Sequence, residues 1–215
     1  KPGPTLKIDR ICRHGRTYQD YLNFIADHPN LPVRQLDTVE GIRGGAVLLT
    51  IHIIEASFQL AFLLTNKTAQ SVIDIFSYLF ALLGEETYDM LFPVLLTDNG
   101  SEFSNPTSLE WIISNHQHSH LFYCDAGKPY QKGSCENNHS LIRRCIPKGT
   151  NLDTFTQEDI NLMMSHINSY TRSKLGNKSA YEVLAFMYGE DLPTRLGIQF
   201  VPPEEINLTP QLFNK

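Results

Sequence analysis

Apolar and polar residues alternate in short blocks along the first third of this chain, and these blocks predict β-strands. Residues 33–39 are expected to form a strand that ends at the glycine-rich turn EGIRGG. Residues 46–55 and 58–65 are rich in β-branched and apolar side chains and are separated by two residues, which predicts an antiparallel hairpin. The first three strands are therefore expected to form an antiparallel meander.

Apolar residues then recur at helical spacing over residues 68–83, which predicts a helix packed on the sheet. Thr68 or Ser71 is a candidate N-cap residue, and Gly84 stands where glycine commonly ends a helix. The other elements expected in this half are strands at 92–97 and 120–124 and short helices around 17–26 and 108–114.

Helical periodicity dominates the second half of the chain. Residues 133–145 predict a helix that closes at Pro147, and further helices are expected at 156–170 and 179–188. We expect three parts along the chain, namely a lead-in segment over 1–30, an α/β core over 31–175 and a helical extension with a tail over 176–215.

The composition is that of a globular protein, since 41% of the 215 residues are hydrophobic and 19% are charged. Apolar runs such as 46–54 are far shorter than the roughly 20 residues that cross a bilayer, so no membrane partner is expected. The first residues do not show the pattern of a secretory signal, which predicts a cytoplasmic location. Because the chain starts at Lys1, we expect it to be a fragment of something longer.

The formal net charge of −5 does not favour a protein that coats nucleic acid without specificity. A core that holds carboxylates in order to bind cations is itself acidic, so the charge is compatible with a metal-dependent enzyme. The cysteines are expected to be reduced packing residues, because they lack zinc-knuckle spacing and no His-Asn relay accompanies them. They are Cys12, Cys124, Cys135 and Cys145.

Three acids stand out by their position. Asp37 lies in the first predicted strand, Asp98 ends the fourth, and Glu136 lies in the first turn of a helix. If the first and fourth strands are parallel neighbours, Asp37 and Asp98 point into one crevice, and the helix can deliver Glu136. Converging carboxylates repel one another unless a divalent cation neutralises them, so the pattern indicates a site for Mg²⁺ or Mn²⁺. Two such ions would suit in-line attack at a phosphodiester.

Each acid also has an ordinary structural interpretation. Asp98 precedes an Asn-Gly pair and can cap an Asx turn, in which the pair permits positive φ. Asp37 can be a solvated strand residue, with Glu40 as another candidate ligand. Glu136 can be a favourable charge at a helix N-terminus.

The acid-bearing segments LLTDNGSEF and YCDAGKPYQKGSCENNHSLIRRCIPKGTNL resemble the catalytic core of DDE transposases and retroviral-type integrases. The likeness is greatest to the insertion-sequence-thirty type of bacterial transposase. Asp98 and Glu136 are separated by 37 residues, close to the family's spacing, and QLDTVEG is similar to its first-acid strand. With GRTYQDYLNFI and NSYTRSKLGNKSAYEVL, the resemblance extends from Gly15 to about Leu184, although Ala180 stands where similar chains more often have proline.

The resemblance implies an α/β, ribonuclease-H-like fold, in which a five-stranded mixed sheet combines the meander with parallel strands between flanking helices. It implies DNA strand cleavage and 3′-hydroxyl strand transfer with two Mg²⁺ or Mn²⁺ ions held by Asp37, Asp98 and Glu136. The implied partners are transposon ends and target DNA at the nucleoid, a homodimer or higher assembly on that DNA, and a helix-turn-helix segment before Lys1. An inactive relative that only binds DNA or protein, and a stand-alone nuclease of this fold, remain alternatives.

Basic and aromatic residues surround the third acid and are candidates for contact with DNA phosphates and bases. A solvated surface is the other interpretation of such a stretch. The candidates are Lys128, Tyr130, Lys132, His139, Arg143 and Arg144.

The segment HQHSH places His116, His118 and His120 at alternate positions. On a strand these three side chains would share one face, which would favour zinc. No closely spaced cysteine pair accompanies them, so surface or turn histidines are the default expectation.

Overall fold

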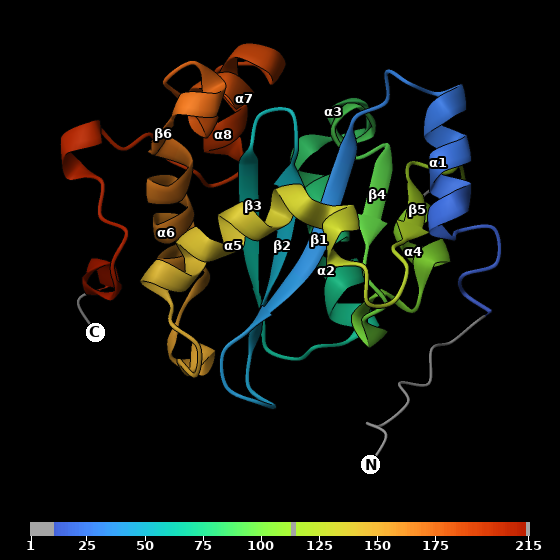
Figure 1. Cartoon of the computed structure of the whole chain (residues 1–215), viewed down its shortest axis with the longest axis horizontal. Coiled ribbons are helices and arrows are strands. Elements are labelled where there is room, and N and C mark those ends of the chain that lie inside the picture. Colours follow the sequence, from blue (N-terminus) through green and yellow to red (C-terminus); the bar gives the residue numbers. More distant parts are fainter. Residues whose placement is uncertain (1–10, 113–114, 214–215) are drawn as a thin grey trace.

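The computed structural model describes residues 11–112 and 115–213, with the backbone alone at Pro129 and at residues 133–138. A five-stranded sheet of order β3-β2-β1-β4-β5 forms its centre (Figure 1). The strands are β1 (Val33–Glu40), β2 (Val47–Ile53), β3 (Phe58–Leu64), β4 (Val94–Thr97) and β5 (His120–Tyr123).

The sheet is mixed. β1 pairs antiparallel with β2, and β2 pairs antiparallel with β3, which gives the meander. β1 pairs in parallel with β4, and β4 in parallel with β5. The expected five-stranded sheet of meander plus parallel strands is therefore confirmed, including the contact between the first and fourth strands.

Eight helices lie around the sheet in the described part of the chain. Side-chain caps begin several of them: the Thr17 hydroxyl caps α1, Thr68 caps α2, and Ser179 caps α7. The helices are α1 (Tyr18–Asp27), α2 (Ala69–Leu83), α3 (Glu85–Leu91), α4 (Pro106–Glu110), α5 (Gly133–Cys145), α6 (Gln157–Ser169), α7 (Ala180–Tyr188) and α8 (Leu192–Arg195). A two-stranded sheet, β6 (Thr171–Arg172) with β7 (Lys178–Ser179), precedes α7.

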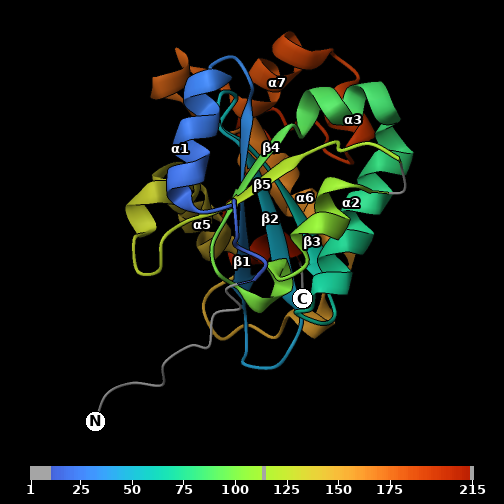
Figure 2. The same ribbon diagram turned by 90° about the vertical axis from the view of Figure 1, so that its right-hand side faces the viewer.

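The helices form layers on the two faces of the sheet. α1 and α5 lie on one face, and α2 and α3 lie on the other (Figure 2). α6 runs beside β3, the strand at one edge (Figure 1). The side-chain amide of Asn168 in α6 hydrogen-bonds to both the backbone N–H and the C=O of Gln59. The side-chain amide of Gln157 accepts from the N–H of Leu63 and donates to the C=O of Ala61. These side-chain amides satisfy an edge that would otherwise be open to pairing with another chain.

Two helices were not expected from the sequence. Gly84 has φ of 76° and ends α2, and it also lies at the N-cap position of α3. Two helices therefore meet at one glycine, where the sequence indicated only an ending. The four-residue helix α8 lies in the predicted helical extension, after the helix expected at 179–188. The short helix expected around 108–114 begins earlier, at Pro106, and residues 113–114 lie outside the described residues.

The helix α2 has 15 residues. Within residues 11–112 and 115–213, no helix is long and apolar enough to cross a bilayer.

His52 makes the stability of the fold depend on pH. It is fully buried in β2, opposite Gln35 of β1 and Gln59 of β3. Burial lowers the pKa of its imidazole from 6.5 to about 3, so the folded state keeps it neutral while the unfolded state takes up a proton below pH 6.5. The contribution of His52 to the free energy of unfolding is therefore fully present above pH 6.5 and is lost progressively as the pH falls toward 3.

We expect the change from pH 7 to pH 5 to lower the free energy of unfolding by about 2 kcal/mol through His52 alone. Urea unfolding of the wild type and of His52→Gln at both pH values measures this contribution. The variant is expected to lose about 2 kcal/mol less than the wild type over that interval. Equal losses in the two proteins would show that His52 does not cause the dependence.

Candidate active site at the ends of two parallel strands

Asp37 and Asp98 lie side by side because their strands are parallel neighbours. Gln35 of β1 is opposite Leu96 of β4, so two residues further along each strand Asp37 meets Asp98. The Nζ atom of Lys132 lies 3.1 Å from Oδ2 of Asp37 and 3.9 Å from Oδ2 of Asp98. The same ammonium donates a hydrogen bond of 2.9 Å to the backbone oxygen of Leu36. Two carboxylates thus converge on one positive charge.

The two carboxylate oxygens of Asp98 have different partners, one in the loop backbone and one in the site. Its Oδ1 accepts a 3.0 Å hydrogen bond from the N–H of Gly100, which is the Asx turn that the sequence allowed. Its Oδ2 is the oxygen that faces Lys132. The turn and the convergence on a cation are therefore compatible.

The positive φ that the Asn-Gly pair permits is not used, since Gly100 has φ of −60°. Glycine is required here for space, because a Cβ atom would lie 2.4 Å from Oε2 of Glu102. Asn99 instead fixes the loop by donating from Nδ2 to the backbone oxygen of Cys124, at 2.9 Å.

Asp37 is held by its own strand and by the helix above it. Its Oδ1 accepts a hydrogen bond from the N–H of Thr38, at 2.8 Å. Nδ1 of His139 in α5 lies 4.0 Å from its Oδ2, and Nε2 of the same ring lies 3.0 Å from the hydroxyl of Thr50. One quarter of the Asp37 side chain remains exposed, so this carboxylate is accessible to a ligand.

Glu136 lies on α5, which starts at Gly133 immediately after Lys132. It precedes His139, which lies against Asp37 of β1 and Thr50 of β2, by one helical turn. The Glu136 side chain lies outside the described residues, so its convergence with the other two acids stays a prediction.

A cleft of about 660 Å³ opens beside the two aspartates. Its lining includes three residues that the sequence interpretation did not single out: Arg13, Lys67 and Glu102. Glu102 is 1% exposed, and its Oε1 accepts from the Thr38 hydroxyl at 2.8 Å and pairs with Lys67 at 3.3 Å. Its position in TDNGSEF, four residues after Asp98, was the available signal.

Glu40, the other candidate ligand near Asp37, has a different partner. Its carboxylate is about half exposed and pairs with Nζ of Lys67 at 2.7 Å. This ion pair lowers the pKa of Glu40.

Three of the six candidate DNA-binding residues lie on the surface. Tyr130 is 72% exposed, and Arg144 is exposed at the far end of α5. Lys128 is exposed and pairs with Asp125 at 2.9 Å across the loop that precedes α5.

The other three candidates bond to the sheet. Lys132 is 8% exposed and lies against the two aspartates, and His139 contacts Asp37 and Thr50. Arg143 donates to the backbone oxygen of Glu40, at 2.8 Å. Of these three side chains, Lys132 lines the cleft, His139 approaches Asp37 from α5, and Arg143 lies against the end of β1.

The buried thiols of Cys124 and Cys145 do not offer a nucleophile. Cys124 lines the cleft, and burial raises the pKa of its thiol to about 11. Burial also raises the pKa of Cys145 to about 11. Both remain protonated near pH 7, where the thiolate is the reactive form.

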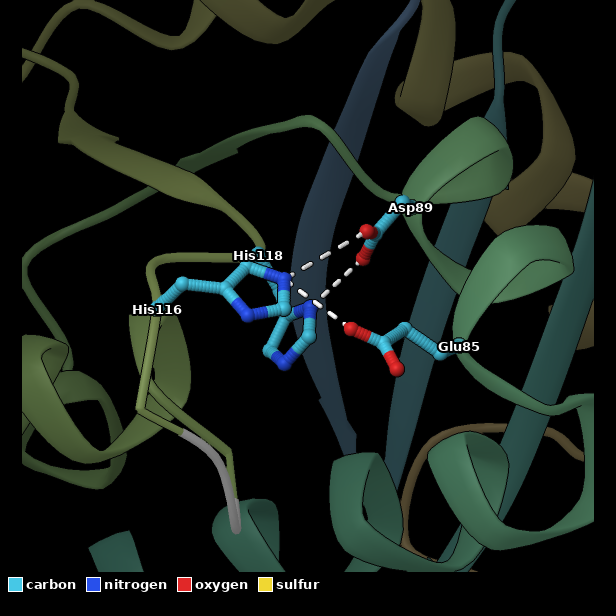
Figure 3. A group of neighbouring side chains, drawn as sticks. All are labelled: Glu85, Asp89, His116 and His118. Atoms are coloured by element: carbon cyan, nitrogen blue, oxygen red, sulfur yellow. Dashed lines mark hydrogen bonds and ion pairs between the residues drawn. The ribbon is translucent and has the colours of Figure 1, made fainter.

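A second cluster of polar side chains lies at α3, on the other face of the sheet from α5 (Figure 2), and has the ligand atoms to hold a metal ion. Glu85 and Asp89 of α3 lie against His116 and His118, which precede β5 (Figure 3). His120 is not part of it, since its ring packs on Phe24 of α1 with centroids 4.5 Å apart. The three histidines therefore do not share one face, and one of them, His118, is buried in place of lying on the surface.

Insertion-sequence transposases are similar to this chain in sequence. The transposase of IS1086 from Cupriavidus metallidurans is 37% identical over 30% of this chain and 19% of its own length. The transposase InsI of IS30A from Escherichia coli is 32% identical over 42% of this chain and 22% of its own length. The ORF3 protein of Spiroplasma virus SpV1-R8A2 B, which is named as an integrase, is 29% identical over 69% of this chain and 44% of its own length.

These likenesses confirm the resemblance that the sequence motifs carry, although no family model matches the chain. The chain spans less than half the length of these curated relatives.

The catalytic core domain of the integrase of BIV has a similar structure. Its TM-score is 0.51 at 18% sequence identity, over 76% of this chain and 97% of that domain. The likeness confirms the ribonuclease-H-like fold, in which β1 and β4 carry the two aspartates.

Proposed function

We propose that this chain is the catalytic core of a transposase, which cleaves DNA strands and joins 3′-hydroxyl ends to target DNA with the help of divalent metal ions. One observation carries the proposal: adjacent parallel strands place Asp37 and Asp98 at the edge of one cleft, with both carboxylates facing the same cation. The similarity to insertion-sequence transposases and the integrase-core fold support it.

The residues present fit a divalent metal. Oxygens of Asp37 and Asp98 already surround one positive charge, and hard carboxylate oxygens are the ligands that Mg²⁺ and Mn²⁺ prefer. Asp37, Asp98 and Glu136 would hold the metal. Two bound ions supply activation of a water or 3′-hydroxyl and neutralisation of the leaving oxygen.

Lys132 serves as the internal counterion of the two aspartates. Its ammonium lies between the two carboxylates and offsets their mutual repulsion without a metal. His139 and Thr50 restrain Asp37 from the side of the helix and of β2. The chain thus holds its acids in place before any ligand arrives, which lowers the cost of ordering them on binding.

DNA is the proposed substrate, with the cleft as the place where a phosphodiester meets the acids. Lys128, Tyr130 and Arg144 are the exposed contacts that we propose for the DNA, and Lys132, which lines the cleft, together with His139 and Arg143 is proposed to contact DNA nearer the reacting phosphate. Because transposition joins two element ends to a target, we propose a homodimer or larger assembly on DNA. It would act at the chromosome in a bacterial cytoplasm.

Lys132→Met is expected to tighten Mn²⁺ binding about tenfold, because the metal then no longer competes with an ammonium for the two carboxylates. Met has a similar length and leaves the buried stem packed. Titration calorimetry of Mn²⁺ into the wild type and the variant measures the change. Lys128→Met is the matched control, since that lysine pairs with Asp125 and not with the site acids. Weaker or equal affinity in Lys132→Met would contradict the counterion role.

The proposed function is tested by mixing the chain with plasmid DNA and a short labelled duplex that has free 3′-hydroxyl ends, with Mg²⁺ or Mn²⁺ present. Joining of the duplex to the plasmid is the expected result. Nicking without joining would instead identify a stand-alone nuclease of this fold. Neither product, with DNA bound in a mobility-shift assay, would identify a relative that only binds DNA.

A further inference from the structure

A mixed cluster of carboxylates and imidazoles lies between α3 and the segment that leads into β5. Figure 3 shows Glu85, Asp89, His116 and His118 directing their side chains toward a common point. Nδ1 of His118 is 2.6 Å from Oδ1 of Asp89. Nε2 of His116 is 3.2 Å from Oε1 of Glu85 and 3.8 Å from Oδ2 of Asp89.

The four ligand atoms have the spacing of a small metal site. One atom from each residue lies within 4.8 Å of all the others. Tetrahedral Zn²⁺ with ligands at about 2.0–2.2 Å places neighbouring ligand atoms about 3.4 Å apart. The observed separations lie on both sides of that value, so small side-chain rotations would bring all four atoms to bonding distance.

His118 provides a second, independent observation. Its side chain is completely buried, and the rings of Phe80 and Tyr88 pack against its imidazole. Nε2 of this ring is buried and has no hydrogen-bond partner among the described residues. Nδ1 therefore carries the only hydrogen bond of the ring in this part of the chain, and it points into the cluster. Packing against the Phe80 and Tyr88 rings, and not a hydrogen bond at Nε2, therefore holds this imidazole with Nδ1 facing the cluster.

The charges of the cluster also call for a cation. Glu85 and Asp89 are four residues apart on one helix, so their carboxylates share a face and repel each other. Within residues 11–112 and 115–213, their ion-pair partners are these two histidines, without a lysine or arginine. A divalent ion would neutralise both carboxylates at once.

The cluster is separate from the proposed active site. α3 ends just before β4 and the histidines come just before β5, whereas Asp98 follows the last residue of β4. The four residues of β4 span about 13 Å between the two ends. Two imidazole nitrogens also favour Zn²⁺ over Mg²⁺, unlike the carboxylates at the other end.

We infer that Glu85, Asp89, His116 and His118 form a structural Zn²⁺ site that joins α3 to the start of β5. The metal would fix the N-terminal ends of β4 and β5, whose C-terminal ends lie beside the proposed active site.

Zinc titration of the intact, demetallated chain tests the site, with excess Mg²⁺ present to saturate the carboxylate cleft. One Zn²⁺ per chain is expected to bind, and at a hundredfold excess over Kd it raises Tm by about 5 °C or more. Bound Co²⁺ should give the intense visible absorption of tetrahedral coordination. His116→Ala is expected to weaken zinc binding at least 30-fold and Glu85→Gln about tenfold, while His14→Ala, at an exposed histidine elsewhere, leaves the affinity unchanged.

His116 and Glu85 are more than half exposed, so their replacement should leave the fold intact, which circular dichroism verifies. The site is overturned if zinc does not bind at micromolar concentration. It is also overturned if the double variant Glu85→Gln/His116→Ala binds as tightly as the wild type, or if Asp98→Asn removes the zinc.

Discussion

Asp98→Asn should lower metal-dependent DNA joining by at least about 10³-fold, which corresponds to about 4 kcal/mol of transition-state stabilisation. Asp98 contributes one of the two described carboxylates that face the cation position. An amide removes the negative charge that holds a divalent ion, and with it the activation of the attacking oxygen. Quantifying joined product against time for both proteins, at saturating Mn²⁺, gives the ratio.

The same change should leave the fold nearly untouched. The structural duty of Asp98 is to accept a hydrogen bond from Gly100, and the amide oxygen of asparagine accepts the same bond. We therefore expect the free energy of unfolding to change by less than about 0.5 kcal/mol.

Asp125→Asn is the matched control for this prediction. Asp125 also lines the cleft, but its carboxylate is exposed and pairs with Lys128. That variant is expected to retain most of the activity. Undiminished joining by Asp98→Asn would remove the proposed mechanism, and loss in both variants would show that cleft charge matters more than metal ligation.

Arg34→Ala should destabilise the fold by about 3 kcal/mol. Arg34 is fully buried in β1, three residues before Asp37. Its guanidinium donates to the backbone oxygen of Leu91, pairs with Glu55 at 2.6 Å and bonds the hydroxyl of Tyr188 in α7. Alanine would remove the donor to Leu91 and the cation beside Glu55, which would keep only the hydrogen bond from the Tyr188 hydroxyl, and it would open a cavity between β1, α3 and α7. The midpoint of urea unfolding measures the loss.

Two further variants separate the contributions at Arg34. Tyr188→Phe removes two hydrogen bonds, one accepted from Arg34 and one donated to Glu55, and should cost about 2 kcal/mol. The double variant Arg34→Met/Glu55→Gln removes the charge pair together and should recover part of the loss, because Glu55 is then no longer an unpaired carboxylate. A cost below 1 kcal/mol for Arg34→Ala would mean that solvent replaces its partners.

Local patterns in the sequence predicted the sheet well. β2 and β3 are apolar runs separated by a short turn, and α5 has the predicted bounds. The parallel contact of β1 with β4 was the condition under which Asp37 and Asp98 would converge, and the fold that the resemblance implied, and the pairing register confirms it. These features depend on periodicity and on strand order, which a single sequence contains.

Features that arise from tertiary packing were not predictable in this way. Lys132 looked like one of several surface lysines, yet its stem is buried and its ammonium meets β1. Glu85 and His116 are separated by 30 positions in the sequence. The helix α3, which carries Glu85, has no side-chain N-cap from which its start could be predicted. Contacts of this kind depend on how helices pack on the sheet, and local propensity does not encode that packing.

The divided role of the Asp98 carboxylate bears on how such a chain can change over generations. Codons for aspartate and asparagine differ at one nucleotide, and either residue satisfies the Gly100 turn. A well-folded but silent descendant is therefore a single base change away, and folding alone exerts no selection against it. An acid at this position would persist in a lineage only where the chemistry itself is under selection.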